Sequence, residues 1–397
     1  MEQEKGTIAI QSRKIVKRAL DDGYGLAIWR LPHSNEKHLI IDFDGSRNPE
    51  SALEQLPSGV LFCPYQKNPK NNDRFIHADL HIQESQEGPE KIIIHPSKQY
   101  VADEFLQQVE TQEEDNDKKP GWHVGQQGIS RIEKSHFIQY VQKSIDAIRD
   151  KRFDKVVAAR AKNRQLPQEF DVLNLFDNLS EKYPNAFVSV ISLPETGTWI
   201  GATPEHLIGI SPDLTFYTTA LAGTQAYEPG MRLSDAAWKQ KDIEEQAFVS
   251  RYIINCFKKI RLREFAESGP KTVKAGNLIH LKTDFYVNMN EVNFSQLGSV
   301  MLELLHPTSA ICGMPKEAAS QFIDEEESLD RKYFSGYLGP VNMQEDTQLF
   351  VNLRCMELHR NEATFFAGAG ITIDSDPEME WQETEMKMNT LLNCIET

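Results

Sequence analysis

Residues 1–105 alternate short apolar runs with turn residues, a pattern that predicts β-strands. The runs that predict strands are GLAIWRL (25–31), HLIIDF (38–43), VLFCPY (60–65), FIHADLHI (75–82) and KIIIH (91–95). A polar and charged stretch follows at 112–122, closed by Pro120 and Gly121. Such a stretch predicts a linker.

The next apolar periodicity is helical. Phe137, Val141 and Ile145 recur on one face and predict a helix over 135–150 that is capped by Ser135. Strand patterns then return, separated by short stretches with Pro and Gly, which favours antiparallel pairing. These runs are DKVVAAR (154–160), AFVSVISL (186–193), TWIGA (198–202), HLIGI (206–210) and LTFYTTAL (214–221).

Two longer helices are predicted in the second half of the chain. Val249, Ile253 and Phe257 form the apolar stripe of a helix over about 235–263. The last helix begins near Ser375, where Ser375 and Glu378 have the spacing of a capping box. Between these helices two more strands are predicted, FVNLRCMEL (350–358) and ATFFAGAGI (363–371).

Composition narrows the possible partners. The 397 residues are 40% hydrophobic and 26% charged, an ordinary globular balance, with a formal net charge of −16. That charge argues against nucleic acid or an anionic membrane as a partner. The five cysteines form no C-x-x-C pair and predict neither disulfides nor a zinc site. Without a signal-type segment or a long apolar run, we expect a cytoplasmic protein.

Two pairs of acids on separate predicted helices are candidate metal ligands. Asp242 and Glu245 share a helix face that continues as an apolar stripe, and Glu380 and Glu383 repeat the arrangement with Lys387 one turn on. Acids aligned with a buried stripe need a partner, and carboxylate oxygens suit Mg²⁺. The alternative from spacing alone is that both pairs lie on solvated helix ends.

Lys155 and Glu205 are candidate proton-transfer groups. Lys155 shares a strand face with Val157, where a desolvated lysine could act as a base, although an edge lysine that extends to solvent has the same pattern. Glu205 lies between a proline-containing turn and an apolar strand, where burial would make it a general acid. A solvated turn carboxylate is the alternative for Glu205.

The remaining polar features carry weaker signals. Two glycine-containing segments, ALAGT (220–224) and FAGAGI (366–371), could present backbone N–H groups to an anion or could simply be turns. On one strand, His77, Asp79 and His81 would share a face, which suits a transition metal but is more typical of a solvated face. The apolar surroundings of His280 indicate a core histidine first and a site residue second.

In their order and spacing, nine segments resemble the chorismate-utilising enzymes, which comprise isochorismate, salicylate, anthranilate and aminodeoxychorismate synthases. They are FDKVVAAR, GATPEHLIG, TTALAGT, KDIEEQAFV, LIHLKT, LLHPTSAICGMPKEAA, ESLDRKYFSGYLG, LFVNLRC and FAGAGITIDSDPEMEWQETEMK, within about residues 130–395. The resemblance implies an α/β (α+β) fold of large, mainly antiparallel sheets packed together with helices on the outside. It also implies an N-terminal extension of the same fold over 1–120 and a catalytic region over 121–397.

The resemblance also implies roles for these residues. Lys155 corresponds to the lysine that activates the attacking water, and Glu205 to the acid that protonates the departing 4-hydroxyl. Glu245 and Glu383 correspond to the Mg²⁺-binding glutamates, with neighbouring acids Asp242 and Glu380. The residues implied to contact the substrate chorismate or line its site are Gly223, Thr224, His280, Ala310, Arg354, Gly368 and Lys387.

Departures from the family pattern guide the choice among its members. Gln246 stands where many members have His, and Phe334 stands where salicylate and anthranilate synthases usually have Tyr. Phe334, Ala310 and Ile311 are expected on the enolpyruvyl side of the site and resemble the isochorismate branch. The resemblance therefore implies a Mg²⁺-dependent isochorismate synthase that needs no glutaminase subunit.

Three alternatives stay open at this stage. A salicylate synthase would eliminate pyruvate in the same site. Lys155 argues against an amine-installing enzyme, because anthranilate synthases lack a lysine at this position. An inactive chorismate-binding regulator is disfavoured because Lys155, Glu205 and all four acids are present.

Overall fold

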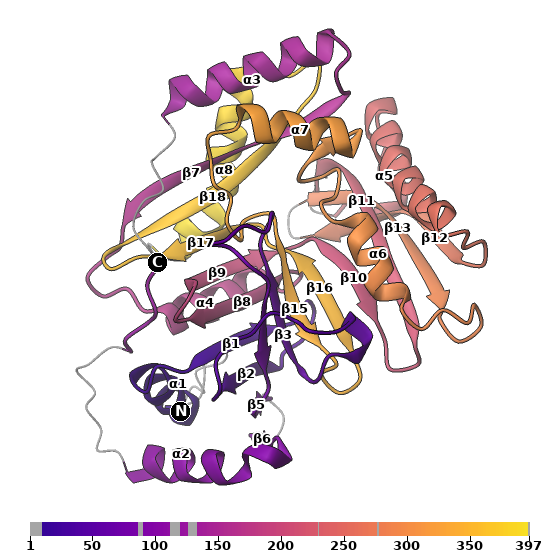
Figure 1. Ribbon diagram of the computed structural model, residues 1–397. Coiled ribbons are helices and arrows are strands. Elements are labelled where there is room, and N and C mark those ends of the chain that lie inside the picture. The colour runs from indigo at the N-terminus through magenta and orange to yellow at the C-terminus, as the bar shows by residue number, and fades with distance from the viewer. Residues whose placement is uncertain are drawn as a thin grey trace.

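The structure, a computed structural model, describes residues 10–85, 90–111, 120–125, 133–228, 230–275 and 278–395. Within those ranges the chain forms eight α-helices and two large sheets (Figure 1). The helices are α1 (Ile10–Asp21), α2 (Gln99–Thr111), α3 (Lys134–Arg149), α4 (Val172–Lys182), α5 (Gln240–Lys259), α6 (Leu297–Leu305), α7 (Lys316–Glu326) and α8 (Pro377–Ile395).

Both sheets are antiparallel throughout their described pairings. The ten-stranded sheet has the spatial order β14 (Gly313–Met314), β7 (Lys155–Gln165), β18 (Glu362–Ile371), β17 (Cys355–Leu358), β9 (Gly197–Thr203), β8 (Phe187–Leu193), β1 (Gly25–Arg30), β2 (Lys37–Asp42), β5 (Leu80–Glu84) and β6 (Lys91–Ile94). The eight-stranded sheet has the order β12 (Ala266–Ala275), β13 (Leu278–Asn288), β11 (Thr215–Ala226), β10 (His206–Ile210), β16 (Thr347–Val351), β15 (Tyr337–Val341), β3 (Gly59–Cys63) and β4 (Arg74–His77).

Alternation along the strands buries both faces of the ten-stranded sheet. In β1, Leu26 and Ile28 pack in a cluster with side chains of α1, α4 and α8, whereas Ala27 and Trp29 pack against the eight-stranded sheet. Successive side chains of a strand point to opposite faces of the sheet, which explains how one strand contributes to two hydrophobic clusters.

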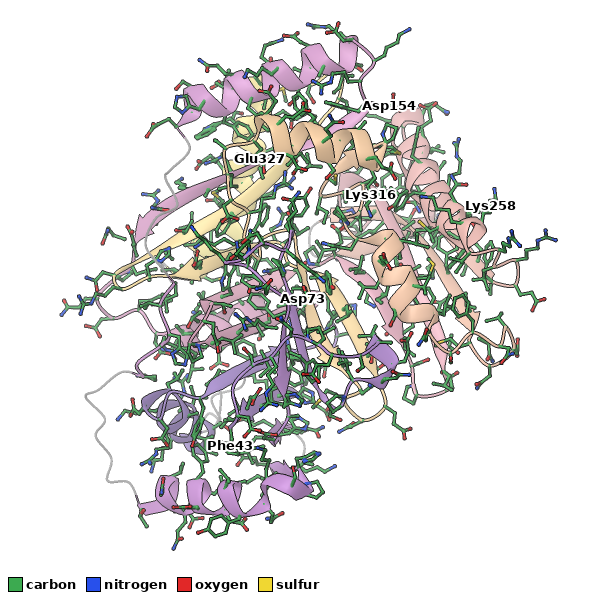
Figure 2. The ribbon with its side chains drawn as sticks, in the orientation of Figure 1. Phe43, Asp73, Asp154, Lys258, Lys316 and Glu327 are labelled. Atoms are coloured by element: carbon green, nitrogen blue, oxygen red, sulfur yellow. The ribbon has the colours of Figure 1, made fainter. Side chains whose placement is uncertain are left out.

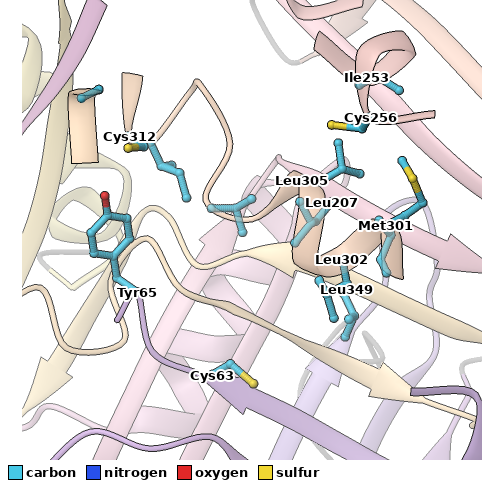
Figure 3. Close-up of a cluster of buried hydrophobic side chains, with 14 of the residues drawn as sticks. Cys63, Tyr65, Leu207, Ile253, Cys256, Met301, Leu302, Leu305, Cys312 and Leu349 are labelled. Atoms are coloured by element: carbon cyan, nitrogen blue, oxygen red, sulfur yellow. The ribbon is translucent and has the colours of Figure 1, made fainter. Parts of the chain in front are cut away.

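A third cluster covers the other face of the eight-stranded sheet. Leu207 of β10 and Leu349 of β16 pack there with Leu305 of α6 and with Ile253 of α5 (Figure 3). The order of layers is therefore helices, ten-stranded sheet, eight-stranded sheet and helices, which confirms the predicted fold class.

The N-terminal strands belong to both sheets. β1, β2, β5 and β6 extend the ten-stranded sheet, and β3 and β4 extend the eight-stranded sheet. The domain boundary at residue 120 stays a prediction, and most of the predicted linker, 112–119, lies outside the described residues.

Two predicted strands are each broken in two. FIHADLHI divides into β4 and β5, because Asp79 turns away and accepts a hydrogen bond from the Phe43 backbone N–H at 3.0 Å. His77, Asp79 and His81 thus do not share one strand face, and His81 is buried rather than solvated. FVNLRCMEL divides into β16 and β17, which belong to different sheets.

The predicted helix ends also need correction. α3 is preceded by Glu133 at its N-cap, not by Ser135. At the start of α8, the Asp376 carboxylate accepts hydrogen bonds from the backbone N–H groups of Glu378 and Met379, whereas the Ser375 hydroxyl accepts one from Thr372. Asp376 therefore caps this helix.

Other expectations from composition can be compared directly. All five cysteines are free and buried, so the prediction of no disulfide is confirmed. Among the described residues, no helix is both long enough and apolar enough to cross a membrane.

A pair of histidines, the half-buried His38 and the buried His81, predicts acid sensitivity of the fold. His38 stacks on Trp29, and its Nδ1 lies 3.1 Å from Nε2 of His81. Burial lowers the pKa of His38 to about 4 and the pKa of His81 to about 3. Protonation therefore favours the unfolded chain below about pH 6.5, the ordinary histidine pKa. Stability that is complete above that pH is lost as the pH falls towards 4 and 3.

We expect His38→Gln/His81→Gln to lose less unfolding free energy than the wild type between pH 7.5 and pH 5. The difference is at most about 1.4 kcal/mol per pH unit for each histidine. Urea denaturation at both pH values measures it, with the exposed His95→Gln as control. If the double variant lost as much unfolding free energy as the wild type, the two histidines would not be the source of the acid sensitivity.

Candidate functional site

Two neighbouring connections carry the chain between the sheets. β9 ends in the ten-stranded sheet and β10 begins in the eight-stranded sheet, with Glu205 between them. β16 and β17 make the reverse crossing, with Arg354 between them. Backbone hydrogen bonds join the crossings, from Val351 N–H to the Glu205 carbonyl at 3.0 Å and from Ala202 N–H to the Arg354 carbonyl at 3.1 Å.

Arg354 has a backbone conformation that is unusual for its residue type. Its φ is 48°, in the left-handed region that a side chain disfavours. This turn ends one sheet strand and starts another within three residues. Strain of this kind persists where surrounding structure fixes it, and here both flanking strands do so.

A cavity of about 940 Å³ is lined in part by Glu205. Residues from β10, β11, β13, α5 and the segment 308–310 form much of its wall. Five predicted site residues line it: Glu205, Gly223, Glu245, His280 and Ala310.

Glu205 also lies beside a cluster of three basic side chains. Burial raises the pKa of Glu205, while the charges of Lys155, Arg354 and Lys387 and a hydrogen bond with Thr308 lower it. Burial likewise lowers the pKa of Arg354 and of Lys387. Glu205 therefore joins the cavity to a cationic cluster, and a proton on this carboxyl is favoured by its burial.

Lys155 is the first residue of β7, and Gly370 of the neighbouring strand β18 leaves room for its side chain. A methyl group placed on Gly370 would lie 3.0 Å from Cε of Lys155. Lys155 pairs with Met314 of β14, so this end of β7 is not a sheet edge. The prediction of an edge lysine is therefore wrong, and Gly370, which lies in the predicted segment FAGAGI but was not named as a site residue, leaves room for the Lys155 side chain. Its two-residue spacing from Gly368, on the same strand face, was the available signal.

Gly368 and Lys387 are brought together on β18 and α8. The Lys387 ammonium donates a hydrogen bond to the Gly368 carbonyl at 2.7 Å and pairs with the Glu383 carboxylate at 2.5 Å. Two of the predicted substrate-binding residues and one predicted metal ligand thus form one chain of contacts.

A β-bulge at Gly223 shapes the opposite wall. The pairing of β11 with β13 shifts between Ala222 and Thr224, and Gly223 has a φ of 67°. The Gly223 carbonyl lies 3.1 Å from Nδ1 of His280, whose pKa is lowered by burial. Thr224 pairs with His280 through the backbone, and its side chain lies outside the described residues. A left-handed glycine is what a bulge of this kind requires.

The predicted metal ligands lie on α5 and α8. Asp242 accepts hydrogen bonds from Lys239 N–H at 3.3 Å and Gln225 Nε2 at 3.2 Å, at the start of its own helix. Glu245 is exposed and lines the cavity, and Glu380 is partly buried. In the described ranges, no three His, Cys, Asp or Glu side chains gather into a group that could hold a metal ion. The four-acid metal site stays a prediction.

Gln246 and Phe334 have structural surroundings. The buried Gln246 amide donates to the Ala220 carbonyl and to the Thr283 hydroxyl, which anchors α5 to the sheet beside Glu245. Phe334 is only 2% exposed and stacks on Phe366 in the core between the sheets. Phe334 is not among the residues that line the cavity, and its expected place on the enolpyruvyl side of the site stays a prediction.

Sequence comparison places the chain among proteins of one family. The profile of the chorismate binding enzymes matches residues 36–396. Isochorismate synthase EntC of Escherichia coli (strain K12) is 31% identical over 269 residues, which are 66% of this chain and 68% of that protein. The vibriobactin-specific isochorismate synthase of Vibrio cholerae is 29% identical over 271 residues, covering 66% and 67% of the two chains.

Solved structures share the architecture. The menaquinone-specific isochorismate synthase MenF from Escherichia coli superposes with a TM-score of 0.77 at 20% identity, covering 99% of this chain and 92% of that one. Anthranilate synthase component I from Streptococcus pneumoniae gives 0.68 at 17% identity, with coverage of 92% and 89%. The same fold thus carries differently named activities. The matched profile, which spans both sheets, establishes that this chain belongs to the chorismate binding enzyme family.

Proposed function

We propose that the protein is an isochorismate synthase, which converts chorismate to isochorismate. The observation that carries the proposal is the position of Glu205, a half-buried acid beside Lys155, Arg354 and Lys387 on the wall of a large cavity. The curated relatives named above are isochorismate synthases, and they support this choice among the activities of the family.

Charge favours a dianionic substrate in this site. Chorismate carries two carboxylates, and Arg354 and Lys387 supply positive charge within a chain of net charge −16. Arginine suits planar carboxylates because its guanidinium can donate two parallel hydrogen bonds. We assign Arg354 and Lys387 to the substrate carboxylates, with Gly223, Thr224, His280, Ala310 and Gly368 as further contacts.

The proposed reaction adds one water and releases another. Lys155 accepts a proton from the attacking water as the new bond forms between the water oxygen and C2 of the ring. The ring double bonds shift, the C4–O bond breaks, and Glu205 gives its proton to the departing hydroxyl, which leaves as water. The two side chains return to their starting protonation states through solvent.

We propose that Glu245 and Glu383, with Asp242 and Glu380 as neighbouring acids, hold Mg²⁺. The donor chemistry fits, because Mg²⁺ prefers oxygen ligands and commonly binds through one or two carboxylates together with waters and substrate oxygens. A group of three acids is therefore not required. Bound Mg²⁺ would supply positive charge for a substrate carboxylate.

The proposed reaction needs neither ammonia nor a glutaminase subunit. The oxygen atom that is added at C2 comes from water, and the oxygen atom that leaves comes from the 4-hydroxyl group of the substrate. The remaining rival is a salicylate synthase, which would go on to eliminate pyruvate.

The first test concerns proton transfer. We expect Lys155→Ala and Glu205→Gln each to lower kcat about 10²–10⁴-fold, the usual loss on removing a positioned proton-transfer group. Chromatographic separation of chorismate and isochorismate measures the rate, and circular dichroism verifies the fold. Exposed Lys143→Ala on α3 is the control. Near-normal turnover by Lys155→Ala would rule out its role as the base.

A second test addresses the metal without using activity. Glu245→Gln and Glu383→Gln should each weaken binding of Mn²⁺, a paramagnetic substitute for Mg²⁺, because each removes a charged oxygen ligand. Electron paramagnetic resonance titration separates free from bound Mn²⁺. Glu244→Gln, one residue along α5 and exposed, is the matched control. Wild-type affinity in Glu383→Gln would exclude α8 from the metal site.

A third test separates the two products. Chorismate with Mg²⁺ should give a mixture of chorismate and isochorismate, with little pyruvate on the timescale of turnover. A lactate dehydrogenase-coupled assay detects pyruvate directly. Pyruvate release as fast as chorismate loss, with no added lyase, would identify a salicylate synthase instead.

A further inference from the structure

Helix α7 is fastened at both ends to the polypeptide around the site. At its start, the Lys316 ammonium donates a hydrogen bond to the carbonyl of His306 at 2.6 Å. At its other end lies Glu327, and Figure 2 shows Lys316 and Glu327 at opposite ends of this helix. The segment between α6 and α7 carries Thr308 and Ala310, both of which line the cavity.

Arg331 is a buried residue behind this segment, and its guanidinium binds several groups at once. Its guanidinium donates two hydrogen bonds to the Glu327 carboxylate, at 2.5 and 2.7 Å. The same group donates to the Ile311 carbonyl at 2.7 Å and to the Val157 carbonyl at 2.8 Å. Glu327 in turn accepts from the Ala159 N–H at 3.1 Å.

These contacts join two parts of the proposed catalytic machinery. Val157 and Ala159 belong to β7, which begins with Lys155. Ile311 follows Ala310 directly. A second bond, from Val157 N–H to the Cys312 carbonyl at 2.8 Å, reinforces the same junction.

We propose that Arg331 and Glu327 are positioning residues that set the placement of Lys155 relative to the Thr308–Ala310 wall. This inference rests on the proposed function. Neither side chain is assigned any contact with substrate. Arg331 is 3% exposed, and its bonds end on backbone carbonyls of the two segments.

The chemistry of arginine explains why this pair can act as a spacer. A guanidinium is planar and has five donors in a fixed fork, so the distances among its acceptors are set together. Apolar side chains could fill the same volume, often without loss of stability, but they would not hold two carbonyls at defined positions. A displacement of about 1 Å at a reacting group can lower the rate about 100-fold.

The test separates positioning from stability. In Glu327→Leu/Arg331→Met no buried charge is left unpaired, so the fold should be retained, as measured by its melting temperature. We expect kcat to fall about 10–100-fold while KM changes less than about threefold, because the substrate contacts lie elsewhere. Lys37→Met/Asp177→Leu removes another largely buried ion pair, together with the contact of Asp177 with Arg13, away from the cavity wall, and is the matched control.

Arg331→Lys provides a second variant should the double variant fail to fold. It keeps the charge beside Glu327 but lacks the fork that reaches Ile311 and Val157 together. The same fall in kcat is expected. Wild-type kcat in either folded variant would overturn the proposal, as would a loss confined to KM.

Hydrogen exchange supplies a readout that does not depend on the reaction. Backbone amides of 153–161 and 306–314 should exchange faster in both variants, with other peptides unchanged. If the wild type makes no isochorismate, the proposed function fails, and these amides still report on the junction. Unchanged exchange in both segments would overturn the positioning role by itself.

Discussion

The two crossings between the sheets are the constraint on which the site depends. Backbone hydrogen bonds from Val351 to Glu205 and from Ala202 to Arg354 join them side by side. Each crossing is anchored at both ends in a large sheet, so its few residues cannot move independently. The acid and the arginine are thus held between strands of two large sheets, as a site with defined geometry requires.

Electrostatics gives this placement its chemical meaning. Burial raises the pKa of Glu205 and lowers the pKa of Arg354 and of Lys387, so each of the three groups loses hydration of its charged form. A bound dianion would restore favourable partners to the two cations, and it would add a reason for Glu205 to hold its proton. Substrate binding and general-acid catalysis would then depend on the same loss of water.

Alternation of apolar residues was sufficient to predict most strands, because burial on either face leaves a simple two-residue period. It failed at FIHADLHI and FVNLRCMEL, where the apolar pattern continues through a break. Neither break contains a glycine or proline. Asp79 is turned by its bond to Phe43, and Arg354 holds a left-handed φ between two sheets. Both causes are tertiary, so no local pattern could indicate them.

The same distinction applies to the site. Residue type and family resemblance indicated Glu205 and Arg354, because a reactive group can be recognised from a single residue within a short motif. Gly370 and Arg331 were missed, since a glycine beneath a lysine is visible only once β7 and β18 are paired. In sequence, Arg331 belongs to an ordinary charged run, D-R-K, that would suit a solvated turn. Only its buried bonds to two distant carbonyls distinguish it, which is why the supports of a site are harder to predict than its reactive groups.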